Sequence, residues 1–188
     1  GSWEDHFHYR WNAEVAAGEG FAAAAIDFHG STGYGQKFTD SISKNWGGAP
    51  YEDIMKGLDY ILSKNSWIDP NRVCALGASY GGYMVNWIEG QTDRFACLVS
   101  HDGQFSNASS YYNTEELWFP EWDLGGTPYD NPSAYEKWSP DKYVKNWKTP
   151  MLIIHGGKDY RLVDTEGMST FTALKKRNVP ARFLYFPE

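Results

Sequence analysis

The chain lacks long apolar runs, clusters of basic residues and a recognisable leader. No run of about 18 apolar residues occurs among its 188 residues, so no membrane-spanning helix is predicted. Its 17 Lys and Arg are scattered and outnumbered by 24 Asp and Glu, giving a net charge of -7. Binding to a nucleic-acid backbone needs concentrated positive charge, so nucleic acid is excluded as the main partner. Residues 1–6 have neither the basic nor the apolar region of a signal peptide.

Cysteine is scarce as well, because only Cys74 and Cys97 occur. Two cysteines are too few for the disulfide framework of a small secreted domain, and they lack the paired spacing of a zinc site. We therefore expect two buried thiols, no metal and no other cofactor.

Aromatic side chains are abundant, at 17% of the residues with nine tryptophans. The excess of aromatic residues is concentrated between residues 101 and 147, where 11 of the 32 lie and where no regular periodicity is visible. Elsewhere, short apolar runs alternate with glycine-rich turns and helical patterns, which is typical of βαβ units around a parallel sheet. With no linker or repeat, the chain is predicted to form one α/β domain over residues 1–188.

Periodicity and turn residues give the expected elements. We expect helices over residues 12–17, 51–64, 79–89 and 163–177, and strands over residues 21–28, 72–78, 95–100, 151–155 and 181–186. Three glycines within residues 30–35 predict a loop.

The sequence Gly-Ala-Ser-Tyr-Gly-Gly at residues 77–82 lies between a predicted strand and a predicted helix. It matches Gly-x-Ser-x-Gly, the strand-to-helix turn that exposes a nucleophilic serine. We expect side chains at Gly77 and Gly81 to collide with neighbouring backbone. The motif makes Ser79 the candidate nucleophile and the N–H of Tyr80 a candidate oxyanion donor at the helix N-terminus.

An activated serine needs a histidine base and an acid, in the chain order Ser, Asp or Glu, His. Asp159 is the preferred acid because it follows the strand 151–155 at the same sheet edge as Ser79. Asp102 is a rival at that edge, and Asp164 is interpreted as the first residue of a helix.

No histidine follows Asp159, since the five histidines are at positions 6, 8, 29, 101 and 155. His101 and His155 lie at strand ends, where each has a simpler interpretation as a polar residue leaving the sheet. We therefore expect the catalytic histidine to lie beyond Glu188.

Several motifs together carry a family resemblance over essentially the whole chain. They are Gly-Ser-Thr-Gly-Tyr-Gly at 30–35, Trp-Gly-Gly at 46–48, Gly-Ala-Ser-Tyr-Gly-Gly-Tyr-Met at 77–84, Ser-His-Asp-Gly at 100–103, Thr-Glu-Glu-Leu-Trp-Phe at 114–119, Pro-Met-Leu-Ile-Ile-His at 150–155 and Asp-Tyr-Arg-Leu at 159–162. The chain resembles the catalytic domain of the prolyl oligopeptidase family of serine peptidases. Within that family it is most similar to the fungal secreted dipeptidyl-peptidase V group.

The resemblance implies an α/β-hydrolase fold, a mostly parallel sheet flanked by helices, here truncated at both ends. It implies Ser79 as nucleophile, Asp159 as acid, a peptide substrate and a secreted protein. Similar members have a His-Gly-Gly-Pro loop before the position of Gly1, an Asn-His-Trp stretch after Glu188, and an N-terminal β-propeller. These features are absent from this sequence, so we expect a fragment.

Three secondary features are open to two interpretations each. Asn107 begins an N-glycosylation sequon in a predicted surface loop. Trp118 and Phe119 either wall a substrate pocket or pack beneath a loop. Glu115 and Glu116 either bind a peptide N-terminus or complement the first turn of a short helix. Arg161 is expected to order the loop of Asp159.

The expected function is a serine peptidase that releases dipeptides from peptide N-termini through an acyl-enzyme. An acylaminoacyl-peptidase or a carboxylesterase would use the same machinery. A further alternative is a catalytically inert hydrolase scaffold, because the isolated chain lacks a candidate base. Nothing in the sequence indicates an oligomeric state.

Overall fold

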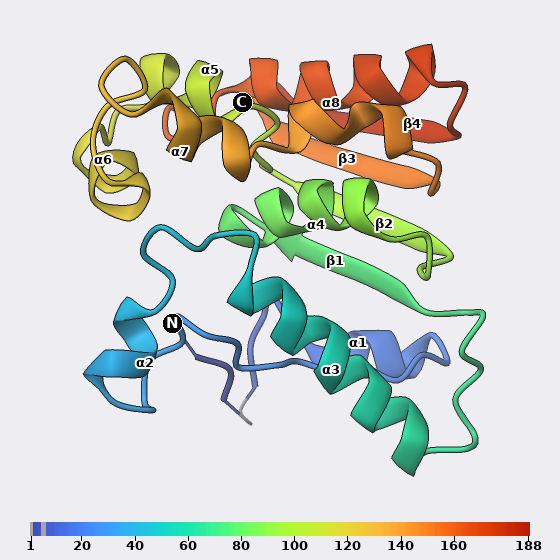
Figure 1. Ribbon diagram of the computed structural model, residues 1–188. Coiled ribbons are helices and arrows are strands. Elements are labelled where there is room, and N and C mark those ends of the chain that lie inside the picture. The colour runs from blue at the N-terminus through green and yellow to red at the C-terminus, as the bar shows by residue number, and fades with distance from the viewer. Residues whose placement is uncertain (1, 5–6) are drawn as a thin grey trace. The chain divides into compact units, whose positions relative to one another are not determined.

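The computed structural model describes residues 2–4 and 7–188, and these divide into two compact units, residues 1–69 and 70–188 (Figure 1). Each unit is described by itself below. Among the described residues, no helix is long and apolar enough to cross a membrane.

The first unit contains the helices α1 (Ala13–Gly18), α2 (Gln36–Asp40) and α3 (Ala49–Lys64). The predicted helices over 12–17 and 51–64 are thus confirmed, and the Asn12 side chain caps α1 by accepting the N–H of Glu14 at 2.9 Å. The predicted loop is confirmed as well, because Gly30, Gly33 and Gly35 all have positive φ.

The strand predicted over residues 21–28 is wrong, because these residues form no strand. The segment instead packs on α3, where Ile26 Cδ1 would lie 2.5 Å from a β-carbon added at Gly57. A strand needs a hydrogen-bonded neighbour, and the described residues of this unit contain no other strand. Alanine-rich residues 22–25 add little intrinsic preference for one.

The second unit is built on a parallel sheet in the order β1-β2-β3-β4, with β1 (Cys74–Ala78), β2 (Cys97–His101), β3 (Met151–Gly156) and β4 (Ala181–Phe186). The helices α4 (Tyr80–Gln91) and α8 (Asp164–Lys176) connect β1 to β2 and β3 to β4. All four strands and both helices match predicted elements within a few residues. Asp164 is the first residue of α8, as expected.

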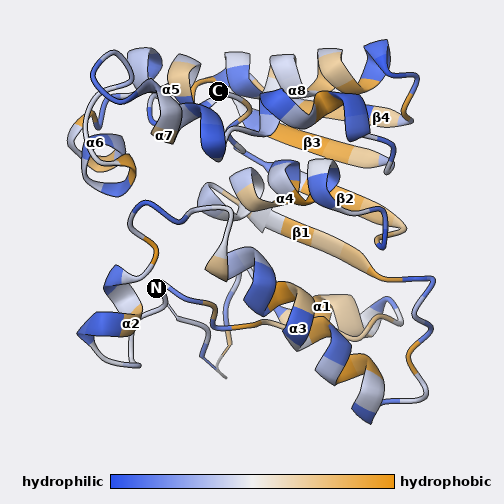
Figure 2. Ribbon diagram, viewed as in Figure 1, coloured by the Kyte–Doolittle hydropathy of each residue, from blue (hydrophilic) through white to orange (hydrophobic). Residues whose placement is uncertain are grey.

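The helices α4 and α8 cover the same face of this sheet. Ser100 of β2 lies beside Gly82 of α4, and His155 of β3 lies beside Gly167 of α8. Ser100 is in register with Ile153, two residues before His155, so both contacts are on one face. Sequential strand order with right-handed crossovers produces this one-sided arrangement. Figure 2 shows the largely apolar strands, and on the opposite face Leu76 is 70% exposed.

Between β2 and β3 the chain forms short helices: α5 (Asn107–Asn113), α6 (Trp118–Leu124), α7 (Pro132–Lys137) and the 3-10 helix η1 (Pro140–Asn146). They were not predicted, because no segment is long enough to display a clear period. Tyr135 of α7 packs against Tyr111 of α5 and is almost fully buried, as is Trp147 directly after η1.

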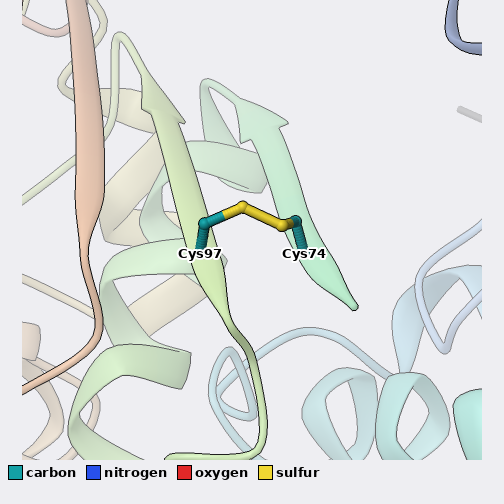
Figure 3. Close-up of a disulfide and its surroundings, with 2 residues drawn as sticks. All are labelled: Cys74 and Cys97. Atoms are coloured by element: carbon teal, nitrogen blue, oxygen red, sulfur yellow. A yellow bond between two sulfur atoms is a disulfide. The ribbon is translucent and has the colours of Figure 1, made fainter. Parts of the chain in front are cut away.

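The interpretation of Cys74 and Cys97 as free thiols is wrong, because they form a disulfide (Figure 3). The two residues are register partners at the first position of β1 and β2, with 4.7 Å between their Cα atoms. Pairing of the strands, which cysteine counting cannot reveal, brings the two thiols together.

The expectation that Asn107 lies in a surface loop is also wrong. Asn107 is the first residue of α5 and is 1% exposed. Its Nδ2 donates to the carbonyl of Tyr135 at 3.1 Å, and its Oδ1 accepts from Gln104 Nε2 at 2.7 Å. The side-chain amide is therefore buried and hydrogen-bonded on both sides, and is not presented to solvent as a surface loop would present it.

Candidate active site

Ser79 occupies a strained turn between β1 and α4. Its backbone has φ 58° and ψ -120°, a left-handed φ that residues other than glycine rarely adopt. The residue is exposed, its N–H donates to the carbonyl of His101 at 3.0 Å, and its own carbonyl accepts the N–H of Tyr83 at 2.9 Å. A serine held in this way at the carboxyl edge of a parallel sheet has the geometry of a strand-to-helix nucleophile turn.

The two flanking glycines of the motif differ in their surroundings. A β-carbon at Gly77 would lie 2.5 Å from the carbonyl carbon and oxygen of Gly81, so a side chain there collides as expected. A β-carbon at Gly81 would meet nothing within 4 Å, so the collision expected at that position is wrong. The second crowded glycine is Gly82, whose β-carbon would lie 2.6 Å from the Cα of Gly103. The turn therefore packs closely against the segment that follows β2.

Tyr80 is the first residue of α4, so its N–H lies at the helix N-terminus beside Ser79. The Tyr80 ring packs 5.5 Å from the ring of Tyr83. Burial, with a smaller contribution from Asp123, raises the pKa of Tyr80 well above 10. The phenol therefore stays protonated, and the backbone N–H at the helix N-terminus remains the candidate donor to a developing oxyanion.

Asp159 lies in the loop that follows β3, at the same edge of the sheet as Ser79. Its Oδ1 accepts the N–H groups of Arg161 and Leu162, both at 2.9 Å. These two bonds fix one carboxylate oxygen, and the other oxygen has no hydrogen bond to any described residue. Such a carboxylate can accept a further N–H, as the acid of a serine hydrolase does.

Two histidines, His101 and His155, belong to the same unit as Ser79. The side chain of His155 is fully buried, and its Nε2 lies 2.7 Å from the carbonyl oxygen of Leu162. Its Nδ1 is buried against Gly167 and has no hydrogen-bond partner among the described residues. His101 is 28% exposed, with its Nε2 3.0 Å from Asp102 Oδ2. His155 is thus a core residue that holds the Asp159 loop.

Asp102, His155 and Asp159 each place one ligand-type atom within 4.8 Å of the others. Their spacing would suit a metal ion. However, Asp102 Oδ1 accepts the N–H of Gly156 at 3.0 Å, and His155 already faces the carbonyl of Leu162. The cluster is therefore explained by hydrogen bonds within the protein.

The aromatic pair Trp118 and Phe119 lies on α6, with side chains 65% and 40% exposed and ring centroids 5.6 Å apart. Exposure of this degree excludes the interpretation that the pair packs beneath a loop. The pair is open to solvent, as a pocket wall must be before substrate binds.

Glu115 and Glu116 precede α6 rather than forming its first turn. Glu116 Oε1 accepts from Arg161 Nη2 at 2.8 Å, and the N–H of Glu115 donates to the carbonyl of Tyr160 at 3.0 Å. Arg161 therefore joins this segment to the loop of Asp159. Glu115 Oε1 is 4.0 Å from Arg161, which leaves it the more accessible carboxylate for a ligand.

The prolyl oligopeptidase family model matches residues 7–188. The chain belongs to the prolyl oligopeptidase family. The resemblance seen in the sequence and the α/β-hydrolase fold are both confirmed, the latter by the parallel sheet with flanking helices and by the similar solved structures of peptidases.

Among curated proteins, the chain is 50% identical to dipeptidyl-peptidase 5 of Schizosaccharomyces pombe over 190 residues, which is 100% of this chain and 28% of that protein. It is 45% identical to dipeptidyl-peptidase 5 of Aspergillus fumigatus over 192 residues, again 100% of this chain and 26% of that protein. The chain thus spans about a quarter of the length of these relatives.

Solved structures of peptidases are similar as well. The acylaminoacyl peptidase of Pyrococcus horikoshii matches with a TM-score of 0.82 and 32% identity, over 86% of this chain and 27% of that one. A puromycin-hydrolyzing peptidase of Mycobacterium tuberculosis matches with a TM-score of 0.77 and 26% identity, over 85% and 24%.

The backbone groups that hold the site were not predicted. The N–H of Leu162 bonds the acid and its carbonyl faces His155. The carbonyl of His101 holds Ser79. Backbone groups have no signature in an amino-acid sequence, whereas the glycine motif around Ser79 has one.

Proposed function

We propose that this chain supplies the nucleophile and the acid of a serine peptidase that releases dipeptides from peptide N-termini. The strained, exposed turn at Ser79 is the observation that carries the proposal. Membership of the family and the high identity to proteins named dipeptidyl-peptidase 5 support it. We further propose that residues 1–188 are part of a catalytic domain in a secreted protein.

In the proposed reaction, Ser79 Oγ attacks the carbonyl carbon of the scissile peptide bond, and its proton passes to a histidine. The N–H of Tyr80 stabilises the oxyanion of the tetrahedral intermediate. Collapse of the intermediate breaks the C–N bond, and the histidine returns the proton to the leaving amine. Water then hydrolyses the acyl-enzyme by the same steps.

Asp159 orients that histidine through its second carboxylate oxygen. His155 is unsuited to the role of base because it is buried and already bonded to Leu162. We place the base in sequence outside residues 1–188, and the isolated chain is accordingly proposed to be inactive. The family resemblance supports a histidine beyond Glu188.

Dipeptide release requires the site to recognise a free amino terminus two residues from the scissile bond. We propose Glu115 as the group that receives the substrate ammonium. It is joined to the loop of Asp159 through the carbonyl of Tyr160 and is less engaged with Arg161 than Glu116 is. Trp118 and Phe119 are proposed to wall the pocket for a substrate side chain.

The first test is Ser79→Ala in the full-length gene product, with exposed Ser133→Ala as the matched control. Turnover of dipeptidyl arylamides should fall by about 10⁴-fold or more, and labelling by a fluorophosphonate should disappear. Thermal unfolding should be unchanged. Wild-type turnover in Ser79→Ala would overturn the assignment.

The likeness to acylaminoacyl peptidase makes that activity the second candidate. Arylamides with a free amino terminus, the same arylamides N-acetylated, and short acyl esters separate the alternatives. Preference for the free amine, weakened in Glu115→Gln but not in the exposed control Glu136→Gln, supports a dipeptidyl-peptidase. Preference for the acetylated substrates would indicate an acylaminoacyl-peptidase, and preference for the esters a carboxylesterase.

A further inference from the structure

Two consecutive residues at the carboxyl end of β2, His101 and Asp102, contact both the turn that carries Ser79 and the loop that carries Asp159. On one side, the carbonyl of His101 accepts the N–H of Ser79 at 3.0 Å. The same carbonyl oxygen would lie 2.7 Å from a β-carbon added at Gly82. The start of α4, and with it Ser79, is therefore held directly against His101.

On the other side, Asp102 holds the beginning of the loop that carries Asp159. Its N–H donates to the carbonyl of Ile154 at 2.8 Å, and its Oδ1 accepts the N–H of Gly156 at 3.0 Å. Gly156 in turn accepts the N–H of Asp159 at 3.3 Å through its carbonyl. Asp102 thus fixes the backbone from which the acid projects.

The Asp102 side chain is itself held in place. Its Oδ2 lies 3.0 Å from His101 Nε2, so the two carboxylate oxygens face different partners and the rotamer is fixed. Asp102 also has a φ of 45°, in the left-handed region that residues other than glycine adopt uncommonly. Such backbone strain is retained where the surrounding contacts require it.

We propose that Asp102 is a positioning residue for catalysis, which sets the place of Asp159 relative to Ser79. This inference rests on the proposed function, because it assumes that Ser79 and Asp159 act together. His101 completes the arrangement, since its imidazole orients Asp102 while its carbonyl holds Ser79. A misplacement of about 1 Å between catalytic groups is enough to cost about 100-fold in rate.

The opposite end of the same two strands provides a matched control. There Asp93, before β2, pairs with Lys148, before β3, with 2.7 Å between Asp93 Oδ2 and Lys148 Nζ. Asp93→Ala therefore removes an aspartate bridge between the same neighbouring segments, at the end remote from Ser79. This variant shows what the loss of an aspartate bridge does to the protein when the surroundings of Ser79 and Asp159 are unchanged.

The experiment compares Asp102→Ala, Asp102→Asn and Asp93→Ala in the full-length gene product, with kcat and KM measured per active site titrated by a fluorophosphonate. Asp102→Ala should lower kcat about 10- to 100-fold and change KM less than about threefold, because the acid loses its support but the substrate pocket does not. Asp102→Asn should retain kcat within about fivefold, since its Oδ1 still accepts the N–H of Gly156. Asp93→Ala should match the wild type in both constants.

Equal kcat in Asp102→Ala and Asp93→Ala would overturn the inference. A kcat as low in Asp102→Asn as in Asp102→Ala would also overturn it, because charge rather than the bond to Gly156 would then be the cause. Ser79→Ala, assayed alongside, distinguishes a failure of the proposed peptidase function from a failure of the positioning role of Asp102. If Ser79→Ala remains active the proposed function fails, whereas an inactive Ser79→Ala with a fully active Asp102→Ala rejects the positioning role alone.

Discussion

His155 Nε2 lies 2.7 Å from the carbonyl oxygen of Leu162, three residues after Asp159. The contact uses Nε2, the ring nitrogen that lies 3.8 Å from Asp102 Oδ1. The imidazole therefore supports the loop and is not available to take a proton from Ser79. The contact with Leu162 identifies His155 as a structural histidine and not a catalytic one. No histidine follows Asp159 in this sequence.

His155→Gln tests that distinction. Gln has an N–H group that can replace the donor to Leu162, so kcat of the full-length gene product should change less than about tenfold. A catalytic base would instead cost about 10⁴-fold or more. His155→Ala, which removes a fully buried side chain and leaves the carbonyl of Leu162 without this partner, should lower the free energy of unfolding by about 1–3 kcal/mol. A loss of about 10⁴-fold in well-folded His155→Gln would return His155 to the role of base.

The crowding at Gly77 and the open space at Gly81 predict opposite responses to alanine. Gly77→Ala should lower the free energy of unfolding by about 1–3 kcal/mol and suppress labelling of Ser79 in the full-length gene product, because the turn must move. Gly81→Ala should leave stability unchanged or raise it by up to about 1 kcal/mol, since alanine favours a helix. Urea unfolding and fluorophosphonate labelling measure both effects, and equal behaviour of the two variants would contradict the packing described.

Much of the sheet and of the nucleophile turn was predictable, and the reason is local. The apolar runs and helical stripes in residues 72–100 and 151–186 indicate one strand or helix each, and Gly77 is required by its close contact with Gly81, four residues later. The strand predicted over residues 21–28 is wrong because a strand also depends on a partner elsewhere in the chain, which the local pattern does not show.

Features that depend on distant contacts could not be predicted. Whether Cys74 forms a disulfide depends on the register of β1 against β2. The burial of the Asn107 amide depends on its bond to Tyr135, which is 28 residues away. The link from Asp102 to Gly156 spans 54 residues and uses a backbone N–H. Sequence indicated that Asp102 lies at the catalytic edge, but not what its carboxylate holds.

The disulfide predicts a response to reductant. Cys74 and Cys97 are separated by 23 residues, and closing a loop of this length stabilises a protein by about 3 kcal/mol through the unfolded chain. A reductant should lower the free energy of unfolding of the wild type by roughly that amount and leave the double variant Cys74→Ser, Cys97→Ser unchanged. Two reactive thiols in the native protein under non-reducing conditions would contradict the pairing.

The buried amide of Asn107 predicts an unoccupied sequon. Asn107→Ala should destabilise the fold by about 1–3 kcal/mol, because Gln104 and the carbonyl of Tyr135 lose their partner. The matched variant Ser109→Ala abolishes the sequon without removing this amide. Mass spectrometry of protein secreted from a glycosylating host should give no glycan at Asn107, and a mass decrease in Ser109→Ala of the size of a glycan would reject the burial.

A buried carboxyl at the end of α4 predicts that stability falls as pH rises. Glu89 is 1% exposed, and its Oε1 accepts the N–H groups of Lys148 and Thr149, both at 2.7 Å. Its Oε2 is buried and has no partner among the described residues. Burial outweighs the hydrogen bonds and raises the pKa of Glu89 from 4.5 to about 7.

Because its pKa is raised, Glu89 makes the fold less stable as pH rises. The folded state binds this proton more tightly than the unfolded state, so the stabilisation is fully present below pH 4.5 and is lost as pH rises through about 7. Over that range the free energy of unfolding should fall by roughly 3 kcal/mol. Glu89→Gln resembles the protonated carboxyl and should remove this dependence, so that it exceeds the wild type in stability at pH 8. Urea unfolding between pH 5 and 8, with exposed Glu136→Gln as control, measures the difference, and parallel pH profiles for the wild type and Glu89→Gln would exclude Glu89 as its source.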